Sequence, residues 1–255
     1  VINDSTVDGD IENNGIFNIN SGTYTFTDSD GLEGIRNNEN GTLTIAGGNL
    51  SGAVYNDGIL NMNGGIIKSK SIALTSAGTT NITSGKIIGY IGIRSHIGTI
   101  NIGVKDGIVD KNSVIISGKN YGIYEAENET VEEYAKFNFY DGTITGKANS
   151  VIDAVISDTE TDYDLHSTTN AESSDLVDVT LEIPNKETFG DVAEVDGVTY
   201  PSVKLAFDSI NSTENKTIKL LKDTLTILNV GNSNKNVTID TNGKKIKYCG
   251  EETFV

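Results

Sequence analysis

The sequence has one cysteine, Cys249, and two histidines, His96 and His166, among its 255 residues. A single cysteine excludes an intrachain disulfide, and neither histidine has a second histidine or a cysteine nearby at metal-ligand spacing. Cys249 also lacks a neighbouring base, so we interpret it as a small buried apolar residue rather than a nucleophile. No apolar run reaches the roughly 18 residues that a membrane-spanning helix needs. The sequence therefore predicts no disulfide framework, no metal centre and no membrane insertion.

Positive charge is also scarce, since the chain has 19 basic residues and 36 acidic ones, which gives a net charge of −17. That field repels phosphate backbones and anionic lipid headgroups, which argues against nucleic acid and membranes as partners. The 28 glycines form no phosphate-binding loop, and we expect no cofactor. Hydrophobic residues make up 36% of the chain, which is low for a compact globule. A repetitive fold tolerates this value, because each of its units buries only a few side chains.

A five-residue phrase recurs within residues 15–157. Its third and fifth residues are mostly apolar, and this period of two is typical of a strand with one buried face. Thr80 breaks the pattern once, and a variant copy, Lys136–Phe139, lacks the leading glycine. The glycine-led copies are Gly15–Ile19, Gly41–Ile45, Gly58–Met62, Gly78–Ile82 and Gly98–Ile102.

Two further phrases follow the first. In the second phrase a glycine, which suits a tight corner, precedes an inward aliphatic residue. These aliphatic residues are Leu50, Ile67, Ile87 and Ile144. In the third phrase a small residue precedes a branched aliphatic one, at 34–35, 53–54, 73–74, 92–93, 122–123 and 154–155. One repeat therefore takes about 20 residues, and insertions at 105–120 and 125–135 lengthen two of the repeats.

Three short strands per repeat, separated by glycine corners, predict an all-β solenoid, namely a three-faced right-handed parallel β-helix. Roughly seven turns, stacked about 4.8 Å apart, would form a rod on the order of 35 Å long. Equivalent inward residues should then align in columns. The predicted columns are residues 17, 43, 60, 100 and 137; residues 19, 45, 62, 82, 102 and 139; and residues 35, 54, 74, 93, 123 and 155.

An asparagine recurs between the two inward positions of the first phrase and should face outward. We predict a ladder in which each amide bonds to the amides of the adjacent repeats, and the alternative is a strip that binds sugar hydroxyls. The asparagines are Asn18, Asn61, Asn81, Asn101 and Asn138.

The repeat fades after Asp158, where the polar stretch 158–175 predicts a loop. Residues 177–183 alternate again, as expected for a last strand or an interdomain strand. An Asp-Gly pair at 196–197 predicts a small hairpin. Apolar residues at 203, 206, 207 and 210 predict an amphipathic helix at about 201–211, with Pro201 in its first turn. Strands at 216–221, 236–240 and 244–248 follow, with a turn at 242–243.

We interpret residues 1–170 as a parallel β-helix, 171–192 as a linker with one strand, and 193–255 as the helix-capped, truncated start of a second β-helix. The helix would cover backbone and apolar side chains that a bare end exposes. Because the sequence begins at Val1 without a methionine or signal peptide and breaks off at Glu251–Val255, we expect it to be part of a longer protein.

The stretches Val195–Val203, Thr217–Asp223 and Val237–Gly243 resemble the entry motif of pectin-lyase-like β-helices in large surface proteins of clostridia and related bacteria. Val203 departs from the family pattern, which usually has leucine there. The Gly-Thr-Leu-Thr-Ile phrases of the first part are similar to those of the same proteins. The resemblance implies an extracellular, cell-surface location and an adhesin-type role on a long multidomain stalk.

The sequence contains few candidate residues for enzyme catalysis. A polysaccharide lyase would need calcium-binding aspartates beside a basic residue, but Arg36 and Arg94 stand two or more turns apart on one outer face without regular aspartates between them. Hydrolysis would need two carboxylates about 5–10 Å apart. The pairs Asp28/Asp30 and Asp106/Asp110 qualify by composition only, since corners and insertions normally carry solvated acids.

Two binding features remain open. The first is an acidic run, 158–164, whose carboxylates alternate as they do in calcium-binding loops. It lacks the glycine that makes the sharp turn of those loops, so we interpret it as a solvated loop. The second is a tyrosine platform for carbohydrate near the third phrase. The acidic run consists of Asp158, Glu160, Asp162 and Asp164, and the tyrosines are Tyr55, Tyr90, Tyr121, Tyr124 and Tyr134.

The sequence thus predicts a non-enzymatic structural or adhesive module, without assigned catalytic, cofactor or metal residues. The insertions at 105–135 and the loop at 158–175 should carry contacts with a carbohydrate or host-surface ligand, as loops on rigid scaffolds do. The first alternative is a carbohydrate-active enzyme, a lyase or hydrolase, which requires a cleft with close carboxylates. The second is a filament subunit that associates end to end with other copies.

Overall fold

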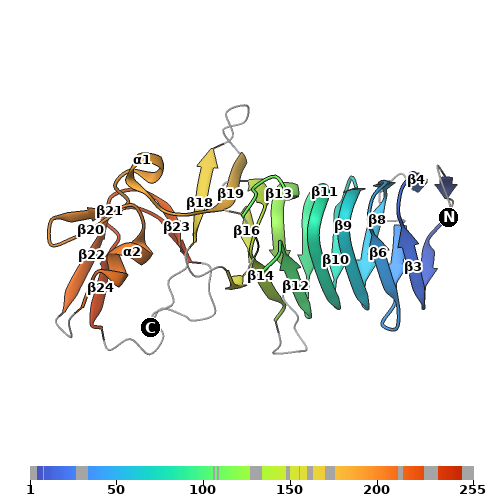
Figure 1. Cartoon of the computed structure of the whole chain (residues 1–255), viewed down its shortest axis with the longest axis horizontal. Coiled ribbons are helices and arrows are strands. Elements are labelled where there is room, and N and C mark those ends of the chain that lie inside the picture. Colours follow the sequence, from blue (N-terminus) through green and yellow to red (C-terminus); the bar gives the residue numbers. More distant parts are fainter. Residues whose placement is uncertain are drawn as a thin grey trace.

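Figure 1 shows the computed structural model of the chain, in which strands stack side by side along most of the long axis. Nineteen of them form one sheet, and most of its pairings are parallel. The structure describes residues 5–7, 9–26, 34–105, 107, 109–126, 134–147, 150–154, 156–159, 163–169, 176–211, 215–226 and 235–248.

The sheet consists of three ladders, each built from one of the three phrases of the repeat. The first ladder contains β3 (Ile16–Ile19), β6 (Thr42–Ile45), the start of β9 (Ile59–Lys68), the start of β11 (Thr79–Ser95), β12 (Thr99–Ile102), β14 (Lys136–Phe139) and β17 (Ile156–Asp158). The second contains β1 (Ser5–Val7), β4 (Thr23–Phe26), β7 (Asn49–Ser51), the end of β9, the middle of β11, the start of β13 (Val114–Glu125) and β15 (Thr143–Lys147). The third contains β2 (Ile11–Asn13), β5 (Gly34–Asn37), β8 (Ala53–Asn56), β10 (Ile72–Ser76), the ends of β11 and β13, and β16 (Ile152–Asp153).

The inward columns of the first ladder are confirmed. Phe17 pairs with Leu43, Leu43 with Leu60, and Ile100 with Phe137, and the column from Ile19 to Phe139 is in register throughout. Thr80 is not a break, because it stands fully buried between Leu60 and Ile100. Its hydroxyl oxygen is 2.9 Å from that of Ser76 and accepts a 3.0 Å hydrogen bond from Asn56, which satisfies it in the core.

The third column is confirmed from Ile35 to Ile123, but its last member is wrong. Ile152, not Val155, pairs with Ile123. Val155 itself lies outside the described residues, and the next residue, Ile156, pairs with Phe137 on the first ladder. The column also begins earlier than predicted, with Ile11 opposite Ile35.

A buried row of asparagines runs beside the third column. Asn13 donates to Asn37 over 2.6 Å, and Asn37 donates to Asn56 over 2.7 Å. Asn37 also donates to the carbonyl groups of Gly41 and Ile59, which links the corner between β5 and β6 to the next repeat. Ser76 and Ser95 occupy the equivalent position in the following repeats. This row satisfies polar backbone groups that the corners would otherwise bury without partners.

The parallel stack ends in two antiparallel strands on the second ladder. β19 (Leu176–Glu182) pairs antiparallel with β15, and β18 (Asp164–Thr169) pairs antiparallel with β19. The strand predicted at 177–183 is therefore a last strand of the large sheet. The loop predicted over 158–175 is wrong at 164–169, where β18 covers the edge of β19 and buries Leu165.

The C-terminal residues form a second hydrophobic core. β20 (Ala193–Val195), β21 (Val198–Tyr200), β22 (Lys216–Leu220) and β24 (Val237–Asp240) form a four-stranded sheet, and β23 (Thr224–Thr226) pairs with β25 (Ile246–Tyr248). The predicted hairpin turn is confirmed, since Asp196 and Gly197 both have positive φ. β22 and β24 are parallel, as are β23 and β25.

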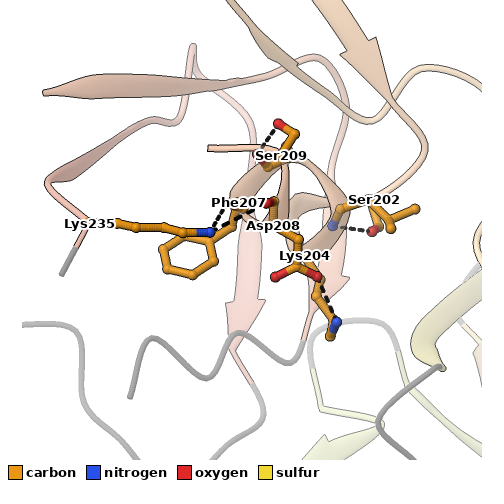
Figure 2. A network of polar contacts seen from close by, with 8 residues as sticks. Ser202, Lys204, Phe207, Asp208, Ser209 and Lys235 are labelled. Carbon is orange, nitrogen blue, oxygen red and sulfur yellow. Dashed lines mark hydrogen bonds and ion pairs between the residues drawn. The ribbon is translucent and has the colours of Figure 1, made fainter. Parts of the chain in front are cut away.

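Two short helices accompany this sheet, α1 (Lys186–Phe189) and α2 (Val203–Asp208). The predicted apolar face of α2 is confirmed, because residues 203, 206, 207 and 210 are all buried. Figure 2 shows how α2 is held: Ser202 caps its first turn by accepting from the Leu205 N–H, and Lys235 donates to the Phe207 carbonyl at its end. Pro201 lies before this cap, not in the first turn as predicted. No described helix is long and apolar enough to cross a membrane.

Candidate functional site

An open groove of about 1220 Å³ lies over the end of the second ladder. Its floor is the outer face of three adjacent strands, β13, β15 and β19, on which outward residues alternate with buried ones. The floor residues are Ile115, Ser117, Thr143, Thr145, Asp178 and Thr180. Four of these six side chains carry a hydroxyl group, so the floor is a regular array of hydrogen-bonding groups on a rigid sheet.

One side of the groove is formed by residues 109–112, from the first of the predicted insertions. This segment is held by Asp141, whose side chain is only 6% exposed. The Asp141 carboxylate accepts 2.6 Å hydrogen bonds from the Asp110 N–H and from the Ser113 hydroxyl. Thr143 adds a 2.6 Å hydrogen bond from its hydroxyl to the Lys111 carbonyl, which ties the segment to the floor. The groove is therefore largely pre-formed, as binding sites usually are.

The other lining residues come from the antiparallel end of the sheet. Tyr163 and Glu182 line the groove, and the Tyr163 ring packs partly buried against the main core. On the floor, Thr145 donates a 2.6 Å hydrogen bond to one oxygen of Asp178, which fixes that carboxylate. Both segments that the sequence predicts to carry ligand contacts therefore contribute, one through residues 109–112 and the other through Tyr163.

The predicted carboxylate pairs lie wholly or partly outside the described residues. Asp110 lies in the groove wall, but Asp106, Asp28 and Asp30 lie outside the described residues. Instead, the groove places Asp110 on the same surface as Asp178 and Glu182. No signal in the sequence predicts this grouping, because it depends on β19 reversing direction to lie beside β15.

The acidic run 158–164 is described in part, and Asp158 in it is committed to other contacts. It accepts a 2.6 Å hydrogen bond from Lys105 and a 3.0 Å one from Tyr140. Burial alone would raise the pKa of Asp158, but these hydrogen bonds outweigh it and hold the pKa below its ordinary value. Glu160 and Asp162, the side chain of Asp164, Cys249 and the side chain of His166 lie outside the described residues. Within the part of the chain that the structure describes, no three His, Cys, Asp or Glu residues group to hold a metal ion.

The two arginines stand on the outer face of the third ladder, as predicted. Register places Tyr55 and Thr75 between Arg36 and Arg94, and Tyr124 follows Arg94. Arg36 forms a 2.6 Å ion pair with Asp10, and the hydrogen bond within this pair raises the pKa of Arg36. The Arg36 guanidinium group also lies 4.6 Å from the centre of the Tyr55 ring. Its charge is thus already paired within the chain.

Arg94 has a different environment. Its Nε atom is shielded from solvent and has no hydrogen-bond partner among the described residues. Burial, and secondarily the charge of Arg94, lower the pKa of nearby His96. The Tyr121 and Tyr124 rings lie 4.8 Å apart, and Tyr90 and Tyr134 are exposed. Since no described contact joins all five tyrosines, the structure does not show the single platform that the sequence suggests.

The predicted asparagine ladder forms on the outer face of the first ladder. Asn81 donates to Asn61, Asn101 to Asn81, and Asn138 to Asn101, over 2.7–3.0 Å. Asn18 is separated from them by Thr44, which occupies the same position in the intervening repeat. The amide groups of this ladder bond to one another, which favours the structural interpretation over a sugar-binding strip.

Comparison with known proteins adds nothing to this geometry: no protein-family model, curated protein or solved structure matches the chain. The function must therefore be argued from the sheet and the groove.

Loss of the Asp141 carboxylate should loosen the groove wall without unfolding the sheet. In Asp141→Ala, the Asp110 N–H and the Ser113 hydroxyl lose their common acceptor, so segment 109–112 should open more often. We expect trypsin to cleave the native protein after Lys111 roughly tenfold faster. Asp153→Ala, which removes an exposed carboxylate of the third ladder, is the control. An unchanged cleavage rate in Asp141→Ala would show that Asp141 does not hold this wall.

Proposed function

We propose that the chain winds as a three-faced right-handed parallel β-helix and serves as a non-enzymatic binding and spacer module of a bacterial cell-surface protein. One observation carries the proposal: three ladders of parallel strands run in register through successive repeats, with one continuous core beneath them. Such stacking gives a stiff, extended body, which suits a role in presenting a binding surface away from a cell. The resemblance to clostridial surface proteins supports the extracellular location.

The groove is the binding surface in this proposal. It is pre-formed, and its walls come from an insertion and from the end of the sheet, where additions to a repetitive fold do not disturb the stack. Hydroxyl groups and carboxylates over a flat floor can bond to the hydroxyl groups of a saccharide, and the Tyr163 ring offers an apolar face. We therefore propose a glycan as the ligand.

One observation favours a second candidate function, a glycoside hydrolase. Asp110, Asp178 and Glu182 all line the groove, and hydrolysis requires two carboxylates that face each other across a sugar. We rank this below binding because Asp178 is held by the Thr145 hydroxyl and Asp110 is held within its own loop, where it accepts a hydrogen bond from the Asn112 N–H.

A glycan array, read beside a reducing-sugar assay, tests the proposal. We expect the full chain to bind at least one class of oligosaccharide and to release no reducing ends. Thr180→Arg, which places a long side chain over the groove floor, should weaken binding roughly tenfold. Thr44→Arg makes the same change on the outer face of the first ladder, away from the groove, and should bind normally.

Three results would contradict this proposal. Failure to bind any glycan would remove the binding role, and equal weakening by Thr180→Arg and Thr44→Arg would move binding away from the groove. Release of reducing ends would establish the hydrolase in its place. Circular dichroism of both variants shows whether the sheet is intact.

A further inference from the structure

We infer that the groove selects a cationic amino-sugar chain, such as a glucosamine oligosaccharide, over neutral and uronic-acid chains. The inference rests on the proposed function, because it names the class of glycan that the same groove takes. Its basis is the charge of the lining residues: three are acidic, Asp110, Asp178 and Glu182, and one is basic, Lys111.

The position of Asp178 makes it the main contact in this inference. It lies on the floor of the groove, opposite Thr145 in the pairing of β19 with β15, and the Thr145 hydroxyl holds one of its oxygens at 2.6 Å. The carboxylate is therefore fixed before a ligand arrives, so little side-chain entropy is lost when an ammonium group binds. A charge-assisted hydrogen bond from a sugar ammonium is stronger than one from a neutral hydroxyl.

The rest of the chain acts in the same direction. A net charge of −17 attracts cations and repels polyuronates before any contact forms. The half-buried Arg94, with its shielded Nε, lies on the third ladder, whereas the groove lies over the second ladder. Arg94 therefore offers no counter-charge to a uronate bound in the groove. Thr180 and Ser117 remain on the floor for sugar hydroxyl groups, which both neutral and amino sugars carry.

A metal ion is the other cation that carboxylates attract, and the geometry disfavours it. The carboxylates of the groove are not grouped in a set of three that could hold a metal ion within the described residues. Hydroxyl groups spread over three strands suit a ligand that extends across the floor, because a metal ion would use only a compact set of oxygens.

The test is calorimetric titration of the full chain with three hexasaccharides of equal length: glucosamine, N-acetylglucosamine and galacturonate. At low ionic strength we expect the glucosamine chain to bind roughly tenfold more tightly than the N-acetylated chain, and the galacturonate chain not to bind. Raising the salt to about 0.15 M should reduce the difference, because exposed charge pairs are screened.

Variants separate a groove contact from a general attraction between opposite charges. Asp178→Asn keeps an oxygen for Thr145 but removes the charge, so it should weaken binding of the glucosamine chain more than binding of the N-acetylated chain and lower the preference for glucosamine about fivefold. Asp153→Asn removes an exposed charge outside the groove and should change neither. Equal losses in the two variants would overturn the inference, as would equal binding of the three sugars or preference for galacturonate. These outcomes leave the proposed glycan-binding role intact, whereas failure of all three sugars together with an empty glycan array would overturn both.

Discussion

Replacement of Asn37 by leucine should lower the free energy of unfolding by about 3 kcal/mol, because leucine has the same branching and the same number of side-chain heavy atoms but forms no hydrogen bonds. Asn37 is 1% exposed and bonds to four partners: it accepts from Asn13 and donates to Asn56 and to two carbonyl groups. Leucine would remove all four of these bonds from the core, although the Gly41 carbonyl keeps a bond from the Ile59 N–H and the Asn13 amide keeps its bonds to two carbonyl groups. Urea unfolding, followed by circular dichroism, measures the loss.

Asn101→Leu is the matched control for this experiment. Asn101 also bonds to two other asparagines, but on the outer face, where the partners are only partly buried. Solvent can satisfy them, so we expect a loss of about 1 kcal/mol or less. Equal losses in Asn37→Leu and Asn101→Leu would mean that the inner row contributes no more than the outer ladder.

Substitution of alanine for Gly58 should cost about 3 kcal/mol, because a β-carbon there would overlap backbone atoms of the preceding repeat. The nearest atoms are the carbonyl oxygens of Gly41 and Asn38, the latter 2.5 Å away, and both are held by backbone hydrogen bonds, from the Ile59 N–H and the Gly41 N–H respectively. Backbone atoms cannot rotate aside as a flexible side chain would. The midpoint of urea unfolding should fall accordingly, with an unchanged slope.

Gly15→Ala is the matched control, since Gly15 begins the same phrase in an earlier repeat. A β-carbon at Gly15 would meet nothing within 4 Å, and alanine reduces the entropy of the unfolded chain. We therefore expect no loss and a gain of about 0.5 kcal/mol. If Gly58→Ala behaved like Gly15→Ala, the repeats would not stack as closely at this corner as the structure shows.

The columns were predictable because one pattern is repeated. Five of the six first phrases place apolar residues two apart, with Thr80 as the exception, and the phrases can only be buried together if equivalent residues align, as those from Ile19 to Phe139 do. The hairpin at Asp196 and Gly197 was also predictable, because its signal lies in two adjacent residues. Only a few residue types accept two consecutive positive φ angles.

The inner asparagine row was missed although its signal is present. In the first four copies of the third phrase, an asparagine or serine stands two residues after the branched aliphatic residue, at Asn37, Asn56, Ser76 and Ser95. A polar residue in a strand is normally assigned to the outer face, and only the regular recurrence at an inward position argues otherwise. A polar residue with a fixed period in a solenoid therefore deserves to be tested as a core residue.

The groove was predictable in its segments but not in its geometry. Insertions interrupt the repeat visibly, so residues 109–112 and Tyr163 lie in regions that the sequence selects. The contacts that shape the groove join residues about 30 apart, such as Asp110 with Asp141 and Thr145 with Asp178. Periodicity carries no information on such pairs, because neither partner repeats.

The reversal of strand direction at β19 and β18 also limits how this protein can lengthen. A parallel ladder accepts another copy of its own unit at any internal position, since each copy presents the same backbone pattern to the next. β19 occupies the edge next to β15 and runs the opposite way, so a duplicated unit can join the parallel ladder only on the side of β19 where β15 lies. Growth of this ladder through duplication is therefore confined to positions before β19, and the groove stays at its end however many units precede it.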